Sequence, residues 1–163
     1  MNIFAVDFCP TTSARMLCDK HINKMIIESC QMLCTALHLR GSSRPGPYRA
    51  TFKGHPCTVW AATSRENWQW LFDHAMALYN EKVFRYGGTH KCYDRVLTYD
   101  FDLDVDWPET GLTPFARAIK KDLYPELLDS PQCTTLVYQE FYRRDKRPFA
   151  VWQRGRPAPA WWC

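Results

Sequence analysis

The longest periodic stretch of the sequence runs from Thr12 to Leu39, and it constrains the fold more than any other feature. At about 100° per residue, its apolar residues fall on one side of a helix and its polar residues on the other. The apolar side contains Ile22, Ile26, Cys30, Leu33 and Leu37. The polar side contains His21, Lys24, Glu28, Gln31 and Thr35. The pattern predicts a long amphipathic helix whose apolar side packs against a core.

The polar side of this helix combines an imidazole, an ammonium group and a carboxylate. Such a set can carry out acid–base chemistry at an electron-poor sugar carbon, so His21, Lys24 and Glu28 are candidate catalytic residues. The same spacing also fits an ordinary solvated face, on which Lys24 and Glu28 form an i,i+4 ion pair. Helical spacing alone leaves both interpretations open.

Three further helices are expected along the chain. A second long pattern extends from Thr58 to Tyr86, and Gly87-Gly88 provides its stop signal. Shorter helices are predicted from Pro114 to Lys121 and from Thr134 to Arg144.

The remaining segments lack a helical period. Asn2–Phe8 is compatible with a short strand or an extended lead-in, and Asp100–Asp106 with an edge strand or a loop. From Arg147 to Cys163 the chain is rich in proline and aromatic residues, which predicts an irregular segment laid over the domain. With 163 residues, of which 46% are hydrophobic, we expect a single compact domain over residues 1–163 that is mainly α.

Eight cysteines are present, but none forms a CxxC pair and no second pair has zinc-ligand spacing. No apolar signal segment precedes the chain, and no apolar run could cross a membrane. We therefore expect a cytoplasmic protein with reduced cysteines. The acidic segment 100–106 lacks the glycine and glutamate of a calcium loop, and nucleotide-phosphate and hydrolase motifs are absent. The sequence thus implies no metal and no organic cofactor.

The net charge of +4 is unevenly distributed, since basic and aromatic residues gather near the end of the chain. Cations neutralise phosphates, and aromatic rings stack on exposed bases. The candidate DNA contacts are His55, Arg85, Arg143, Arg144, Lys146 and Arg147. Structural alternatives exist for them. His55 could cap the helix that follows it, Arg85 could form a surface pair with Glu81, and the terminal aromatic residues could cover the core.

The spacing Leu17-x-Asp19-x-His21, with Glu28 seven residues after the histidine, resembles the bacteriophage endonuclease V family of pyrimidine-dimer DNA glycosylases. That family is small and mainly helical, and it carries a histidine and its catalytic glutamate on the first helix at this separation. It also has a Gly-His step before a second long helix that ends in a basic turn. The similar segments here are Gly54-His55 and Arg85-Tyr86-Gly87.

The resemblance implies that Glu28 is the catalytic carboxylate and that His21 is the active-site histidine. The family uses the free amine of its mature N-terminus as a nucleophile, which forms an imine with the sugar. Asn2 is a bulky second residue, so we expect Met1 to be retained and to supply this amine. Lys24 is an alternative nucleophile, and a third option is attack by water with no lyase step.

The sequence therefore predicts a monomeric DNA glycosylase that excises a damaged or modified pyrimidine from double-stranded DNA, with AP-lyase activity if the nucleophile is an amine. Two alternatives belong to other classes. A base-modifying transferase acting on altered pyrimidines would need a donor co-substrate and would leave no abasic site. A non-catalytic phage-type DNA-binding protein would depend on Glu28 only for stability.

Overall fold

The computed structural model describes residues 1–162, and the regular elements in this range are helices, so the predicted mainly α class is confirmed. The elements are α1 (Pro10–Met16), α2 (Asp19–Leu39), α3 (Pro56–Ala61), α4 (Arg65–Tyr86), the π-helix η1 (Tyr93–Leu97), α5 (Pro125–Leu128), α6 (Thr134–Asp145) and the 3₁₀ turn η2 (Ala160–Trp162). Asn2–Phe8 forms a lead-in without a strand, and Asp100–Asp106 forms a loop.

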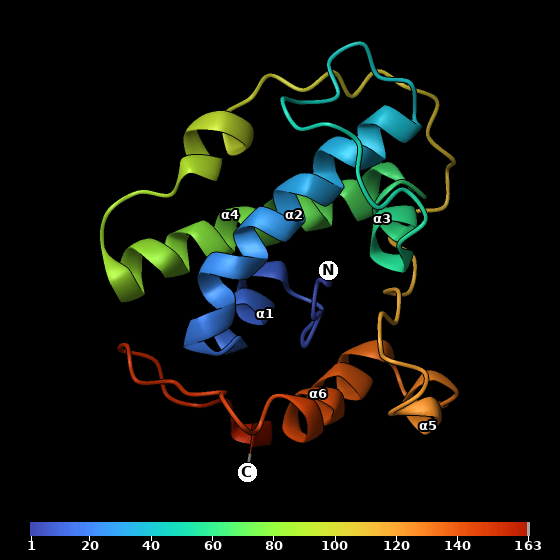
Figure 1. The fold of residues 1–163 in the computed structure, drawn as a ribbon. Helices are drawn as coiled ribbons and strands as arrows, with labels where there is room; N and C mark the ends of the chain where they lie inside the picture. Colours follow the sequence, from blue (N-terminus) through green and yellow to red (C-terminus); the bar gives the residue numbers. More distant parts are fainter. Residues whose placement is uncertain (163) are drawn as a thin grey trace.

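Helices α2 and α4 cross at the centre of the fold, and α1 packs against α4 (Figure 1). The five positions predicted to form the apolar side of α2 are all fully buried, which confirms that side of the pattern. In Figure 1 the N-terminal segment lies between α2 and α6. Helix α6 turns Tyr138, Phe141 and Tyr142 inward, so the core contains residues from both ends of the chain.

The prediction of one continuous helix over Thr12–Leu39 is wrong, because the chain is extended at Leu17 and Cys18 between α1 and α2. The backbone groups freed by this break have partners elsewhere. Arg85 Nη1 donates to the Leu17 carbonyl at 2.9 Å, and the Cys18 N–H donates to the Tyr142 hydroxyl at 3.2 Å. These partners are far along the chain, so the local periodicity could not reveal the break.

The helix predicted over Thr58–Tyr86 is also divided, into α3 and α4. Ser64 is the N-cap of α4, and its hydroxyl accepts a hydrogen bond from the Asn67 N–H at 3.1 Å. The Asn67 side chain in turn donates to the Trp60 carbonyl at 2.8 Å. A serine at this position is an ordinary helix-start signal, which the prediction of one long helix over Thr58–Tyr86 overlooked.

The helix predicted over Pro114–Lys121 is absent, because residues 114–120 have no regular secondary structure; we call this stretch the extended segment. Side chains replace the missing helical hydrogen bonds. The Tyr138 hydroxyl accepts from the Ala118 N–H at 2.9 Å and donates to the Ala116 carbonyl at 2.8 Å. The Asn2 side chain donates to the Ala118 carbonyl at 2.7 Å. The extended segment is therefore held between the N-terminus and α6.

The helix predicted over Thr134–Arg144 is confirmed as α6, and the chain after it is irregular except for η2. This C-terminal segment crosses the corner between α1 and α2. The Trp152 indole donates to the Met16 carbonyl at 3.1 Å, and the Gln153 N–H donates to Asp19 at 2.8 Å. The segment is thus fixed by specific polar contacts.

Candidate active site

A pocket of about 400 Å³ opens between the N-terminal segment, α2, the extended segment and α6. Its lining residues are Met1, Asn2, Phe4, His21, Lys24, Glu28, Ala118, Lys120, Phe141 and Lys146. The four candidate catalytic residues predicted from the sequence all line this pocket. Folding therefore brings the chain terminus and one face of α2 together.

Glu28 lies between two amines at one side of the pocket. Its Oε2 accepts a hydrogen bond from the Asn2 N–H at 2.9 Å and lies 3.9 Å from the Met1 nitrogen. Its Oε1 lies 3.7 Å from Lys24 Nζ. The Glu28 side chain is only 15% exposed, so water screens this carboxylate less than it would a surface glutamate. A carboxylate in this position can accept a proton from an attacking amine.

The two amines differ in their surroundings. The Lys24 side chain is 63% exposed and extends along the surface of α2. Met1 is half-buried as a residue although its side chain is only 5% exposed, so its exposed part is the backbone with the amine. The amine of Met1 therefore faces the pocket while its thioether side chain anchors it in the protein.

His21 forms an inner wall of the pocket. Its ring stacks on Phe4 with 4.8 Å between centroids, and its Nδ1 lies 2.5 Å from the Tyr142 hydroxyl. Burial, followed by the charges of Lys146 and Lys24, lowers the pKa of His21 to about 3. The imidazole is consequently neutral at pH 7. It can orient a group or exchange a hydrogen bond, but it does not supply a positive charge.

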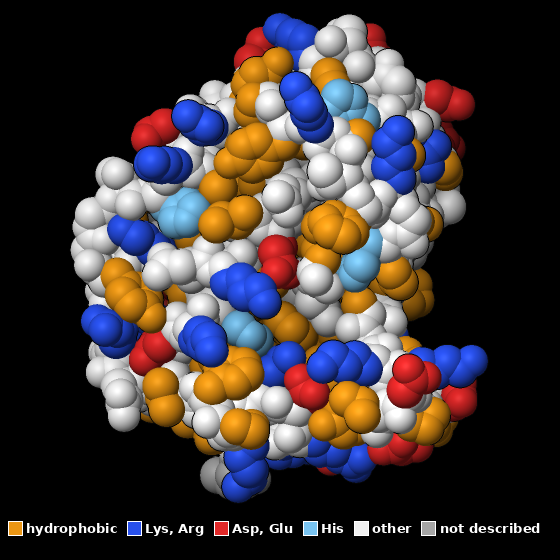
Figure 2. Space-filling view, in the orientation of Figure 1, with side chains coloured by type: hydrophobic (Ala, Val, Ile, Leu, Met, Phe, Trp, Pro, Cys, Tyr) orange, Lys and Arg blue, Asp and Glu red, His pale blue; other side chains and the backbone are white. Residues whose placement is uncertain are grey.

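Cations outnumber carboxylates in the pocket. Lys24, Lys120 and Lys146 line it together with the Met1 amine, whereas Glu28 is the carboxylate among the lining residues. Lys146 is paired with the neighbouring Asp145 at 2.6 Å, and its Nζ lies 5.1 Å from the centre of the Phe4 ring. Figure 2 shows Lys and Arg side chains on this face with acidic side chains between them. The excess of cations in the pocket lining favours phosphate groups there.

His55 lies beside the pocket rather than in its wall. It is the N-cap of α3, and its Nδ1 accepts a hydrogen bond from the Cys57 N–H at 3.2 Å. Burial and the charge of the N-terminal amine lower the pKa of His55, while a hydrogen bond with the Met1 backbone acts in the opposite direction. The capping interpretation of His55 is thus confirmed, and the same residue helps to enclose the chain terminus.

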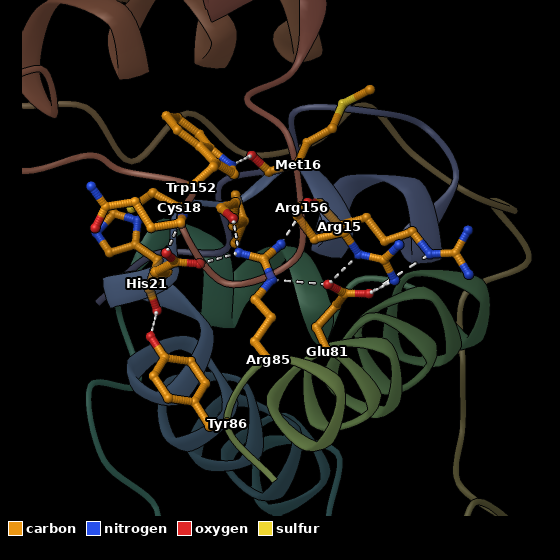
Figure 3. Close-up of polar contacts among 12 residues, drawn as sticks. Arg15, Met16, Cys18, His21, Glu81, Arg85, Tyr86, Trp152 and Arg156 are labelled. Atoms are coloured by element: carbon orange, nitrogen blue, oxygen red, sulfur yellow. Dashed lines mark hydrogen bonds and ion pairs between the residues drawn. The ribbon is translucent and has the colours of Figure 1, made fainter.

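The structure contradicts the expectation that Arg85 contacts DNA, because its side chain is fully buried. Its Nε donates to Glu81 and its Nη1 donates to Asp19, each at 3.0 Å (Figure 3). Arg156 also binds Glu81, at 2.7 Å. The guanidinium group of Arg85 therefore joins α4 to the corner between α1 and α2, and Arg156 attaches the C-terminal segment to the same Glu81.

The other terminal basic residues do not form one patch. Arg143 and Arg144 both pair with Glu140, and Arg144 also pairs with Glu126 at 2.7 Å. Arg147 lies over the Trp162 ring, 5.9 Å from its centroid. Lys146 is the member of this sequence cluster that lines the pocket. Direct DNA contact by the three arginines stays a prediction.

Sequence reasoning missed five residues of the pocket wall, namely Asn2, Phe4, Ala118, Lys120 and Phe141. Lys120 had no usable signal, because its extended segment was predicted as a helix. The sequence did contain a signal for Asn2, since asparagine side chains frequently hydrogen-bond to the backbone two residues later. Phe141 lies on the confirmed helix α6, but periodicity does not show which distant element it faces.

Within residues 1–162 the seven cysteines are unpaired thiols, and no group of His, Cys, Asp and Glu side chains there could hold a metal ion. Among the described helices, none combines the length and the apolar character needed to traverse a bilayer.

A comparison with protein families finds a match over residues 1–94 to the family described as pyrimidine dimer DNA glycosylase. Neither the curated proteins nor the solved structures contain a match. The matched region includes Met1, His21, Lys24 and Glu28, and it ends within η1. The pocket wall formed by the extended segment and α6 lies beyond it.

Proposed function

Because the chain belongs to the pyrimidine dimer DNA glycosylase family, we propose that its pocket releases an altered pyrimidine from double-stranded DNA by attack of the Met1 amine. Family membership places the protein among DNA-repair glycosylases. The observation that supports the proposed chemistry is the Glu28 carboxylate, which lies 3.9 Å from the Met1 nitrogen inside a cationic pocket.

In the proposed reaction, the Met1 nitrogen forms a bond to C1′ of the target nucleotide while the bond from C1′ to the base breaks. The base leaves with the electron pair and takes up a proton, and the attacking amine loses a proton to Glu28. The negative carboxylate also stabilises the positive charge that develops on the sugar. The bond between C1′ and O4′ then breaks, O4′ takes the proton from Glu28, and a protonated imine forms between the amine and C1′.

The imine accounts for the proposed AP-lyase step. It withdraws electrons from C1′, so that a proton can be removed from C2′ by Glu28. The bond between C3′ and its oxygen then breaks, and the 3′ phosphate leaves. A water nucleophile would give base release without strand cleavage, which makes the lyase step a direct consequence of the amine.

Met1 is the preferred nucleophile over Lys24. α-Amines have a reference pKa of about 8 and lysine side chains one of about 10.4, so a larger fraction of an α-amine is neutral and nucleophilic at pH 7. Lys24 also extends along the surface with 63% of its side chain exposed. We propose that Lys24 instead contacts a phosphate, together with Lys120 and Lys146.

The pocket volume of about 400 Å³ lies near the lower end of the range for small-ligand sites, which starts at about 300 Å³, and we propose that it takes one nucleotide. The target nucleotide or its partner must therefore leave the base stack before reaction. We propose that a monomer is the active species, because the Met1 amine, Glu28 and the lysines of the pocket wall supply the reacting and phosphate-binding groups of the proposed reaction.

Borohydride trapping tests the proposal directly. Duplexes that carry a pyrimidine dimer or another altered pyrimidine are incubated with untagged protein, and the products are analysed by mass. We expect free base, strand cleavage and a reducible protein–DNA cross-link on the peptide that contains Met1. An N-terminal extension should abolish the cross-link, whereas Lys24→Ala should retain it. A cross-link lost only in Lys24→Ala would reassign the nucleophile, and base release without a cross-link would indicate water.

A further inference from the structure

The second residue of the chain is held more firmly than a residue next to a terminus usually is. Asn2 is 6% exposed, and its backbone N–H donates to Glu28 Oε2 at 2.9 Å. Its side-chain Oδ1 accepts from the N–H groups of Ile3, at 2.8 Å, and Phe4, at 3.1 Å. Its Nδ2 donates to the Ala118 carbonyl at 2.7 Å. Chain termini are normally mobile unless they are fixed by contacts such as these.

The contact with Phe4 stabilises a sharp turn. Phe4 has a φ of 53°, which is a left-handed conformation that side chains other than glycine rarely adopt. An asparagine oxygen that accepts from the N–H two residues later is a recognised way to support a turn. This turn places the Phe4 ring against His21, 4.8 Å between centroids. The Asn2 side chain therefore fixes the path of the chain on one side of the pocket.

The contact with Ala118 fixes the terminus from the other side. Ala118 belongs to the extended segment, which lies beyond the region matched by the family, and its own N–H is held by Tyr138 at 2.9 Å. Asn2 thus bridges the family-matched part of the chain and the wall that completes the pocket. An asparagine supplies both the acceptor and the donor that this bridge requires, whereas aspartate lacks the donor and leucine lacks both.

We infer that Asn2 is a positioning residue that holds the Met1 amine beside Glu28, an inference that rests on the proposed role of this amine. Asn2 follows Met1 directly and makes four hydrogen bonds between nitrogen and oxygen atoms, so the Met1 amine has few positions open to it. Attack on C1′ requires the nitrogen to lie on a defined line to the carbon, and a displacement of about 1 Å can cost about 100-fold in rate. Loss of the bridge should therefore slow attack without weakening DNA binding.

The test uses the full-length protein and a duplex with a single abasic site, whose aldehyde forms the imine without prior base release. Single-turnover borohydride trapping gives the rate of imine formation, and binding to a duplex with a non-reactive abasic analogue gives the affinity. Asn2→Leu preserves size and a bulky second residue, and intact mass verifies that Met1 is retained. We expect trapping to slow by about 10- to 100-fold, with the dissociation constant unchanged within about twofold.

Gln139→Leu is the matched control. The Gln139 side chain also anchors the N-terminal segment through an amide donor, to the Val6 carbonyl at 2.9 Å, but this contact is remote from the amine. We expect its trapping rate to equal that of the wild type. Asn2→Asp keeps the oxygen acceptor for Phe4 and loses the donor to Ala118, so it should also slow trapping. It replaces Asn2→Leu as the test variant if the leucine variant fails to fold.

Each result decides the inference. The inference is overturned if Asn2→Leu traps at the wild-type rate, or if Asn2→Asp does so where the leucine variant does not fold. It is also overturned if Gln139→Leu loses as much trapping rate as the Asn2 variants. No trapping by the wild type would refute the amine as nucleophile and the inference with it. Trapping at an abasic site that is slowed in the Asn2 variants supports the inference, even if no altered pyrimidine is released, because that failure concerns the proposed glycosylase step alone.

Discussion

Replacement of Glu28 by glutamine isolates the charge of the carboxylate from its other roles. Glutamine keeps the size of the side chain. It also keeps an oxygen that can accept the hydrogen bond from the Asn2 N–H, which is 2.9 Å long with Glu28. The fold should therefore lose little stability. The change removes the negative charge beside the Met1 amine and leaves Lys24 without its partner, so the pocket becomes more positive.

The size of the effect follows from the geometry. The carboxylate lies 3.9 Å from the nitrogen that would bond to C1′, so the charge that develops on the sugar lies at a similar distance. With an effective dielectric constant of about 20, two unit charges at this distance interact by about 4 kcal/mol. A change of about 4 kcal/mol in the barrier corresponds to a rate change of about 1,000-fold. We expect Glu28→Gln to slow base release by this order.

The assay is single-turnover base release from a duplex that contains a pyrimidine dimer, at protein concentrations that saturate the DNA. Glu140→Gln is the control, because Glu140 also forms an i,i+4 ion pair and its loss changes the net charge equally, but it lies outside the pocket lining. We expect the control to react within about twofold of the wild type and Glu28→Gln to bind DNA at least as tightly. Base release by Glu28→Gln within tenfold of the wild type would refute the assigned role.

Three further predictions follow from the same structure. Lys120→Met and Lys146→Met should each weaken DNA binding and reduce by about 0.9 the slope of log affinity against log salt concentration. Combined neutralisation of Arg143, Arg144 and Arg147 should reduce this slope by about 2–3. An unchanged slope in that triple variant would show that the three arginines are only a solvated surface. Arg85→Met should lower the free energy of unfolding in urea by about 3–5 kcal/mol, because it leaves buried Asp19 without its ion-pair partner and removes one of the cations that bind Glu81, whereas Arg65→Met on the exposed start of α4 should have little effect. The pKa of buried His21 is lowered to about 3, so the unfolded state binds more protons than the folded state between about pH 6.5 and 3. The contribution of His21 to stability is complete above pH 6.5 and should decline as the pH falls through this window, by up to about 1.4 kcal/mol per pH unit. His21→Gln should reduce this decline, whereas exposed His38→Gln should not.

The parts of the site that sequence predicts are those that depend on one helix. His21, Lys24 and Glu28 share a face at 100° spacing, and the structure retains that face although the helix begins at Asp19 rather than near Thr12. The buried side of the same helix is equally predictable, because burial of five apolar residues leaves one orientation for α2. The break at Leu17 and Cys18 precedes the positions from which the two faces of the helix were predicted, so it does not change which residues share a face.

The parts that sequence does not predict are those in which a distant side chain satisfies the backbone. Where the chain leaves the helix at Leu17, Arg85 donates a hydrogen bond to the Leu17 carbonyl, and in the extended segment Tyr138 and Asn2 supply the hydrogen bonds of Ala118. Local propensity favours a helix in both places, and neither partner is near in sequence. The same long-range contacts explain why Arg85 reads as a surface cation in the sequence but is buried in the fold.

The region beyond the family match contributes a structural wall rather than the proposed reacting groups. The Met1 amine and Glu28 lie within residues 1–94, whereas Lys120, Phe141 and Lys146 close the pocket from outside that range. Two of these three residues are cations, and Lys146 is among the charges that lower the pKa of His21. The wall therefore acts on the matched residues through charge and through the hydrogen bond from Asn2. In the proposed function this wall surrounds the entering nucleotide, so we expect substitutions at Lys120, Phe141 and Lys146 to alter the choice of substrate before they alter the chemistry at C1′.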